Sequence, residues 1–228
     1  MEKMVKFLTM GISKSYHTPV NIPPEIRVNI IAHWAGRILL PLLGWKTEGR
    51  LPEMPQYVCI VAWHTSNWDF PYGLLASWIF RIHTSFLGKD SLFHGPLGWF
   101  LRQLGGIPVE RSHHHNMVAA AVAAFKTRPH LVFAIAPEGT RRKLDHWKSG
   151  FYHIALQAHV PIVLAYIDYG RKVCGFGPMI YPTGDAEADL AKIREFYSTV
   201  ATKHPELKSE VRFKTADTPM APDHSPNT

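Results

Sequence analysis

Short apolar runs alternate with longer amphipathic stretches along most of the chain, and the two patterns predict strands and helices in turn. The runs that predict strands lie at residues 57–63, 84–89, 106–110, 130–138, 160–168 and 172–181. The stretches that predict helices lie at residues 67–81, 96–104, 114–127, 149–159 and 185–203. Because a very short connection separates the last two strands, we expect them to be antiparallel. Strands that otherwise alternate with helices predict an α/β fold, with a mostly parallel mixed sheet covered by helices on both faces.

An N-terminal amphipathic helix is expected ahead of this region, within residues 25–45. Apolar side chains recur there at helical spacing, at Ile31, Trp34, Ala35, Ile38, Leu39 and Leu42. The opposite side carries Asn29, His33, Gly36 and Arg37. We expect this helix to lie in the plane of a membrane surface, with Pro41 ending or kinking it. The alternative is a helix packed on the domain core.

These patterns divide the chain into three parts. Residues 1–45 form an N-terminal segment with the membrane-associating helix, and residues 46–214 form an α/β domain. Residues 215–228 contain Pro and Ser with little apolar content, so we expect a disordered tail. No stretch of about 18 apolar residues predicts a transmembrane helix, and no cleavable signal peptide is evident. We therefore expect a peripheral, monotopic protein on the cytoplasmic side of a membrane.

Charge narrows the classes of partner. The formal net charge is +7 and the isoelectric point is about 9.4, which suits nucleic acid, anionic lipid or a phosphorylated substrate. A basic surface that only meets solvent would have the same composition. The charged residues are scattered, and no basic run is interleaved with aromatic residues, so we do not expect nucleic acid as a partner.

Cysteine and histidine spacing does not predict a metal site. Cys59 and Cys174 are far apart and each lies in an apolar run, so we expect buried, reduced thiols. Three histidines are adjacent at residues 113–115, but neighbouring side chains on a helix point apart. We expect no bound metal ion.

The sequence "VCIVAWHTSNWDF" holds the first candidate for chemistry. His64 stands at the carboxyl end of a predicted strand, where sites in α/β sheets gather, and Asp69 follows five positions later. If Ser66 or Asn67 caps the next helix, Asp69 lies in its first turn and can curl back to His64. A carboxylate that accepts from Nδ1 leaves Nε2 free to act as a base toward a hydroxyl. The alternative is a helix-capping segment with a structurally satisfied histidine.

Two further strand ends carry groups suited to a phosphate. Arg111 follows the short strand "GGIPVE", and Pro-Glu-Gly-Thr-Arg follows the strand that ends near residue 136. Gly139 allows a tight turn, and Arg141 supplies a planar fork matched to phosphate. Glu138 cannot bind phosphate, but it could accept from an acceptor hydroxyl or orient an arginine. An ordinary turn on a basic surface is the alternative.

Taken together, these motifs resemble the four ordered blocks of the glycerolipid acyltransferases, in particular the bacterial 1-acylglycerol-3-phosphate acyltransferases and related lysophospholipid acyltransferases. The matching positions are His64, Ser66 and Asp69 in the first block, Gly106 through Arg111 in the second, Pro137 through Arg141 in the third, and Val160 with Pro161 in the fourth. The resemblance covers about residues 45–182. Trp63, Ala136 and Arg142 depart from the usual pattern, which puts the acceptor lipid in doubt rather than the reaction class.

The resemblance implies a reaction and a set of roles. A fatty acyl group would move from an acyl thioester, either acyl-CoA or acyl-carrier protein, to the hydroxyl of a lysophospholipid. The expected acceptor is 1-acylglycerol-3-phosphate, and no cofactor is implied beyond the acyl donor. The implied catalytic residues are His64 and Asp69, and the implied substrate-binding residues are Lys89, Arg111, Glu138, Gly139, Thr140 and Arg141. Of these, Lys89, Arg111 and Arg141 would hold phosphate and Glu138 the glycerol backbone.

Three alternatives stay open at this point. The acceptor could be another lyso-lipid, such as a lyso-aminolipid. The protein could be an esterase or thioesterase that uses His64 to activate water. It could also be a lipid- or phosphate-binding module without catalytic activity.

Overall fold

The computed structural model describes residues 28–109 and 114–214. Within them, seven strands form one sheet in the order β1-β7-β6-β2-β5-β3-β4. The strands are β1 (Lys46–Glu48), β2 (Gln56–Ala62), β3 (Thr84–Lys89), β4 (Gly106–Val109), β5 (Leu131–Ile135), β6 (Ile162–Asp168) and β7 (Val173–Ile180). The helices are α2 (Ile30–Leu42), α3 (Asp69–Ile79), α4 (Gly95–Gln103), α5 (His114–Thr127), α6 (Gly150–Ala158) and α7 (Ala186–Ser198). Two 3-10 turns, η2 (Asp90–Leu92) and η3 (Pro205–Leu207), complete the described elements.

The sheet is mixed and mostly parallel, as the alternation of strands and helices predicts. All neighbouring strands are parallel except β6 and β7, whose antiparallel pairing confirms the expectation from their short connection. The sequence pattern did not predict β1, because three residues are too few to show an alternation. Its position follows from pairing with β7, where Lys46 stands beside Val173.

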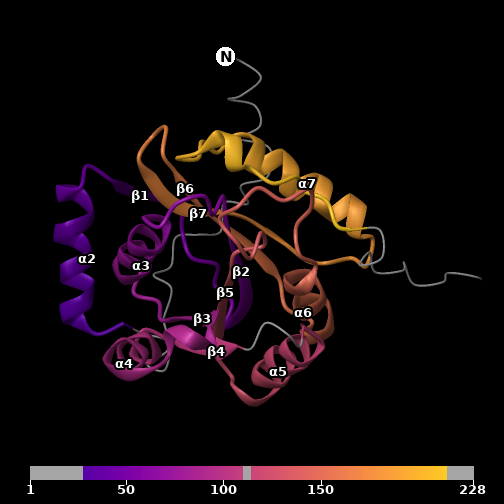
Figure 1. Cartoon of the computed structure of the whole chain (residues 1–228), viewed down its shortest axis with the longest axis horizontal. Coiled ribbons are helices and arrows are strands. Elements are labelled where there is room, and N and C mark those ends of the chain that lie inside the picture. The colour runs from indigo at the N-terminus through magenta and orange to yellow at the C-terminus, as the bar shows by residue number, and fades with distance from the viewer. Residues whose placement is uncertain (1–27, 110–113, 215–228) are drawn as a thin grey trace, which may run out of the picture.

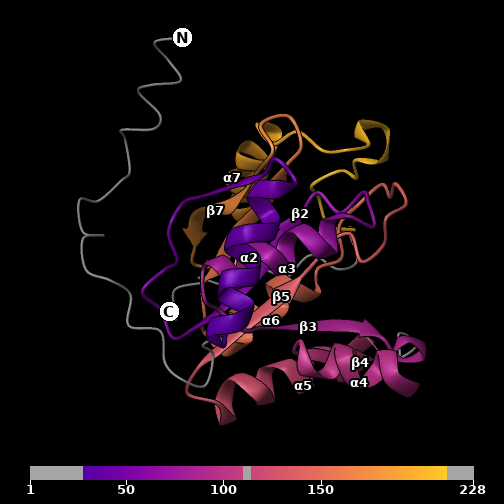
Figure 2. The same ribbon diagram turned by 90° about the vertical axis from the view of Figure 1, so that its left-hand side faces the viewer.

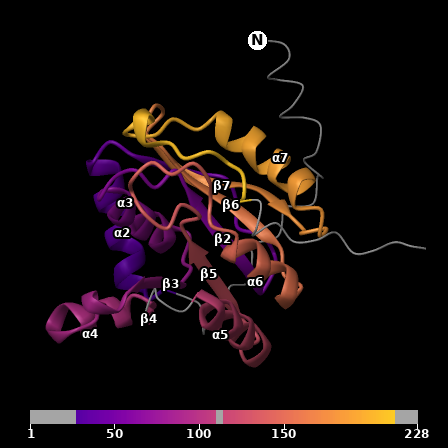
Figure 3. The same ribbon diagram turned by 45° about the vertical axis from the view of Figure 1, so that its right-hand side comes forward.

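Helices cover both faces of the sheet. Along β2, Val58 and Ile60 belong to one buried cluster with α5, α6 and α7, whereas Tyr57 and Cys59 belong to a cluster on the other face. The strand is therefore buried on both sides, as expected for a central parallel strand. In Figures 1 and 3 the strands run between α5, α6 and α7 on one side and α2 and α3 on the other.

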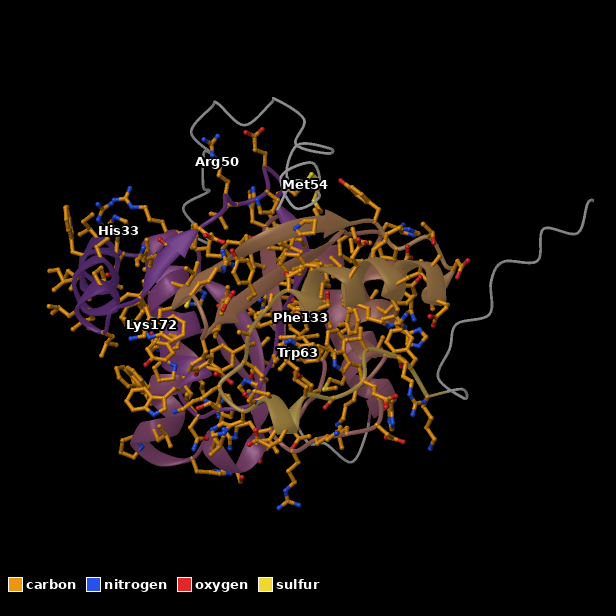
Figure 4. The ribbon with its side chains drawn as sticks, turned by 90° about the horizontal axis from the view of Figure 1, so that it is seen from above. His33, Arg50, Met54, Trp63, Phe133 and Lys172 are labelled. Carbon is orange, nitrogen blue, oxygen red and sulfur yellow. The ribbon has the colours of Figure 1, made fainter. Side chains whose placement is uncertain are left out.

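Aromatic side chains fill the middle of the larger cluster. The Tyr197 hydroxyl, on α7, donates to the backbone oxygens of Ile60 and Ala165 at 3.0 and 2.8 Å. Trp63 packs edge-on against Tyr197 with ring centroids 6.0 Å apart. Figure 4 shows Trp63 near Phe133 at the centre of the molecule. This packing anchors the segment that immediately precedes His64.

Helix α2 turns its apolar side away from the domain. The side that contacts α3 carries His33, Gly36 and Leu40, which are buried. A Cβ at Gly36 would lie 2.8 Å from the Leu75 backbone oxygen, so the two helices approach closely there. The predicted apolar side is exposed, with Ile31 78% and Leu42 77% accessible. Figure 2 shows α2 lying in front of α3, and no other described helix or strand lies over its outer side.

The start and end of α2 follow local chemistry. Asn29 caps the helix, accepting from the Ala32 N–H at 2.8 Å, and Pro41 falls in its last turn. The helix therefore packs on the domain, as the alternative expects, but through His33, Gly36 and Leu40 rather than through its predicted apolar side. Contact of that side with a membrane stays a prediction. Among the described residues, no helix has both the length and the apolar character needed to cross a bilayer. The expected tail, residues 215–228, and residues 1–27 lie outside the described part of the chain.

Candidate active site

His64 and Asp69 meet at the carboxyl edge of the sheet. His64 follows β2 by two positions, and Asp69 is the first residue of α3. The His64 Nδ1 atom lies 3.4 Å from Asp69 Oδ2. The Asp69 side chain is 2% exposed and the His64 side chain 26%, so the ring is accessible and its carboxylate is not. The buried carboxylate therefore lies on the Nδ1 side of a ring that is itself partly accessible.

The connection between them differs from the predicted cap. Trp68, rather than Ser66 or Asn67, is the residue that precedes α3, and its side chain makes no capping hydrogen bond. Instead, the Ser66 N–H donates to Asp69 Oδ2 at 2.8 Å, and the Ser66 hydroxyl accepts from the Trp68 N–H at 3.2 Å. The predicted position of Asp69 in the first turn of α3 is confirmed. Its carboxylate, rather than a capping side chain, accepts the hydrogen bond that closes the loop.

Glu138 joins the second loop to the first. Its side chain is buried, and its two carboxylate oxygens accept from the His64 backbone N–H at 3.2 and 3.3 Å. Burial raises the pKa of Glu138 to about 7, against the opposing effect of the His64 N–H, while the nearby Asp69 charge adds to the rise. The carboxyl group therefore holds the backbone at the base of the imidazole.

A tight turn follows Glu138. The Gly139 N–H donates to the Ala136 oxygen at 3.0 Å, and Gly139 has a φ of +62°, a conformation that favours glycine. The Thr140 hydroxyl accepts from the Arg142 N–H at 3.3 Å. Both features turn the chain so that Arg141 is exposed beside the cavity described below.

A cavity of about 610 Å³ opens at this edge, within the range of small-molecule sites. Its polar lining residues include His64, Asp69, Arg141, Arg142 and Lys148. Its apolar lining residues include Leu74 of α3, Ile82 just before β3, Phe86 of β3 and Phe176 of β7. A cavity with basic groups and a long apolar wall suits a molecule with an anionic head and a hydrocarbon chain.

The structure brings most of the predicted site residues together. His64, Asp69, Gly139, Thr140 and Arg141 line this one cavity, and Glu138 lies behind His64. Two predicted phosphate ligands cannot be located. The Lys89 backbone ends β3, but its side chain lies outside the described part of the structure, as does all of Arg111. The side chains of the three consecutive histidines at residues 113–115 also lie outside it.

Sequence reasoning missed three residues at the site. Arg142 and Lys148 line the cavity, and Tyr169 donates its hydroxyl proton to Asp69 Oδ1 at 2.7 Å. Arg142 was visible only as a departure from a motif. The placement of Tyr169 directly after the strand β6 was a usable signal, because the carboxyl ends of parallel strands share an edge. No sequence pattern around Lys148 indicated a site. Its side chain reaches the cavity because the chain folds back there and places it against the turn at Gly139.

Comparison with known proteins decides the family. The family model described as Acyltransferase matches residues 46–168, which is more than half of the chain. The chain belongs to this acyltransferase family. The matched region contains His64, Asp69 and the turn around Gly139, and therefore most of the residues that line the cavity.

Relatives and a solved structure agree with this assignment. The chain is 32% identical over 146 residues to a 1-acyl-sn-glycerol-3-phosphate acyltransferase of Haemophilus influenzae, covering 60% of the chain and 59% of that protein. It is 35% identical over 149 residues to the protein of that description from Escherichia coli, covering 60% and 58%. The match thus spans less than two thirds of these relatives' own length.

The fold of this acyltransferase-family chain is also that of a solved protein. The crystal structure of the 1-acyl-sn-glycerophosphate (LPA) acyltransferase PlsC from Thermotoga maritima superimposes with a TM-score of 0.53 at 22% identity. The match covers 73% of this chain and 74% of that one. It supports the expected mixed α/β fold for the described domain.

Proposed function

We propose that this protein is an acyltransferase that moves a fatty acyl group from an acyl thioester to the hydroxyl of a lysophospholipid, with 1-acylglycerol-3-phosphate as the first candidate acceptor. The observation that carries the proposal is the buried Asp69 carboxylate 3.4 Å from the imidazole of His64, which lines a cavity that Arg141 also lines. Membership of the acyltransferase family and the names of the relatives support the same reaction.

In this mechanism His64 is the general base. Its Nε2 takes the proton of the acceptor hydroxyl, while Asp69 holds Nδ1 and stabilises the imidazolium that forms. The acceptor oxygen attacks the thioester carbonyl, the carbon–sulfur bond breaks, and the leaving thiolate takes up the proton from His64. General-base help of this kind is worth about 10²–10⁴ in rate. No protein nucleophile takes part.

Basic groups would hold the acceptor's phosphate. Arg141 presents a planar fork that matches phosphate oxygens, and Arg142 and Lys148 add positive charge in the same cavity. Lys89 and Arg111 stay predicted phosphate ligands on the basis of the resemblance. The hydrogen bond that Glu138 accepts from the His64 N–H supports a role in holding the loop that carries His64. Contact of Glu138, Gly139 and Thr140 with the glycerol backbone of the acceptor is a further expectation.

The apolar part of the cavity would hold hydrocarbon. Leu74, Ile82, Phe86 and Phe176 line it, and a fatty acyl chain in this position would leave the thioester carbonyl near His64. Positioning of this kind matters because the two reactants come from different phases. Orientation contributes about 7–11 kcal/mol in well-ordered cases.

The proposed enzyme works at a membrane surface. On α2, Trp34 is 55% and Ile38 57% exposed on the side away from α3, which suits shallow insertion in the plane of the lipid headgroups. The net charge of +7 favours anionic lipid, at about 1 kcal/mol for each well-placed basic residue. Acyl-CoA and acyl-carrier protein are cytoplasmic donors, so we place the protein peripherally on the cytoplasmic side.

The test supplies the purified protein with labelled palmitoyl-CoA or palmitoyl-acyl-carrier protein, with and without 1-acylglycerol-3-phosphate or a lyso-aminolipid, and identifies the lipid product by mass spectrometry. We expect acceptor-dependent product that is lost in His64→Ala. The matched control is His94→Ala, because the His94 side chain is 75% exposed and lies outside the residues that line the cavity. Thiol release that ignores the acceptor would instead identify a thioesterase.

A second pair of variants tests the phosphate site. Arg141→Ala should raise the KM for the acceptor by roughly 10-fold, as expected from the loss of a charged hydrogen bond, and leave the KM for the acyl donor unchanged. Arg128→Ala, at an exposed position just after α5, is the control. An equal KM for the acceptor in the two variants would show that Arg141 does not bind the acceptor.

A further inference from the structure

Tyr169 lies at the carboxyl edge of the sheet, next to the candidate dyad. It follows β6 directly, and β6 pairs in parallel with β2, so that Ala62 stands beside Tyr166. His64 follows Ala62 by two positions and Tyr169 follows Tyr166 by three, so both residues leave the same edge of the sheet on neighbouring strands. Tyr169 falls one residue beyond the region that the family model matches.

The Tyr169 hydroxyl binds the oxygen of Asp69 that does not face the histidine. It donates to Oδ1 at 2.7 Å, whereas Oδ2 accepts from the Ser66 N–H at 2.8 Å and lies 3.4 Å from His64 Nδ1. Asp69 is buried, so rotation of its carboxylate would break both of these short hydrogen bonds. The tyrosine thus restricts rotation of the carboxylate and keeps an oxygen pointed at the imidazole.

Packing fixes the tyrosine in turn. Its ring meets Trp45 edge-on with centroids 5.0 Å apart and Tyr72 with centroids 6.1 Å apart. Its backbone N–H donates to the Ala201 oxygen at 2.9 Å. Burial, and then the hydrogen bond to the Asp69 carboxylate, raise the pKa of Tyr169 far above its ordinary value of 10. The phenol therefore keeps its proton, and stays a hydrogen-bond donor, throughout the pH range in which an acyl thioester is stable to hydrolysis.

We propose that Tyr169 is a positioning residue for the base: its hydroxyl fixes the Asp69 carboxylate so that Oδ2 faces His64 Nδ1 and Nε2 stays free. This inference rests on the proposed acyl transfer for its kinetic consequence. Its structural consequence, a preference of the His64 ring for the tautomer protonated at Nδ1, holds whatever reaction the protein catalyses. The two consequences are measured separately.

The kinetic experiment uses the full chain with palmitoyl-CoA and 1-acylglycerol-3-phosphate. Tyr169→Phe should lower kcat by about 10- to 100-fold, the usual effect of losing one hydrogen bond to a charged group. Both KM values should stay unchanged, because no substrate contact is removed. Tyr72→Phe removes a hydroxyl from the same aromatic cluster and should keep wild-type kcat, and thermal unfolding checks that both variants are folded.

A double-mutant cycle separates positioning from a general loss of structure. In an Asp69→Asn background, Tyr169→Phe should cause little further loss of kcat, because the tyrosine acts only through that carboxylate. Additive losses would overturn the proposal. So would a Tyr169→Phe enzyme with wild-type kcat.

The tautomer experiment does not depend on turnover. With ¹⁵N-labelled histidine, the His64 ring signals are assigned by their loss in His64→Ala, and we expect the Nδ1-protonated tautomer to dominate in the wild type and to lose population in Tyr169→Phe. If the wild type transfers no acyl group but the tautomer ratio still shifts between the wild type and Tyr169→Phe, the proposed function is refuted and the positioning role is supported. An unchanged tautomer ratio in Tyr169→Phe would overturn the positioning role even in an active enzyme.

Discussion

Replacing Glu138 by glutamine tests the electrostatics of the loop behind His64. The glutamine keeps a carbonyl oxygen for the His64 N–H and removes the ionisable group from a buried position. Burial raises the pKa of Glu138 from its ordinary 4.5 to about 7. Each pKa unit corresponds to about 1.4 kcal/mol, so the shift amounts to about 3 kcal/mol of folding free energy.

The sign follows from which state holds the proton more tightly. The folded protein binds the Glu138 proton with the higher pKa, so the stability that this group contributes is fully present below about pH 4.5. It is lost as the pH rises toward about 7, because ionisation is easier in the unfolded chain. The wild type should therefore lose about 3 kcal/mol over this interval relative to Glu138→Gln, which carries no titrating group there.

The assay is urea unfolding of both proteins at half-unit steps from pH 5 to pH 8. The informative quantity is the change with pH in the difference between their free energies of unfolding, since fitting the glutamine amide adds an offset that does not depend on pH. Glu195→Gln, at an exposed position on α7, should give a difference that is flat over the same range. A flat difference for Glu138→Gln as well would refute the reasoning and mean that the carboxyl ionises normally.

Three other substitutions test the packing and the outer surface of the fold. Gly36→Ala should destabilise the protein by about 1–3 kcal/mol in urea unfolding, because the new Cβ would lie 2.8 Å from the Leu75 oxygen and push α2 off α3. Asp189→Ala should cost about 3 kcal/mol in the same assay, since this fully buried carboxylate accepts hydrogen bonds from three neighbouring residues. Ile38→Glu should weaken sedimentation with anionic vesicles by roughly 10-fold without lowering Tm, while Lys126→Gln, which lowers the net charge by the same one unit at an exposed position on α5, should have a smaller effect. Equal binding by these two variants would show that α2 does not contact the lipid.

Local patterns along the chain predicted most of the fold. The central strands and the helices between them carry complete apolar alternations, so both their existence and their order were predictable. The antiparallel direction of β7 followed from the short connection after β6. The pattern failed at β1, where three residues form a strand only because β7 offers its edge.

The candidate site was predictable where its residues are close in sequence. His64 and Asp69 lie five positions apart at a strand end, and Gly139 to Arg141 form one continuous turn. The cap of α3 was predicted incorrectly, because Ser66 and Asp69 bond to each other across the loop. Which residues share the cavity was predictable only in part, as Arg142 and Lys148 show.

By itself, the sequence determined the order of the elements, the pairing of His64 with Asp69, and an apolar stripe on the helix before residue 45. Only the tertiary structure decided that this stripe faces outward, that Glu138 turns its carboxyl to the His64 N–H, and that Tyr169 reaches Asp69. The physical reason is distance along the chain. Hydrophobic periodicity reports which side of an element is apolar, but a contact between Tyr169 and Asp69, 100 residues apart, depends on strand order and register, which no local pattern carries.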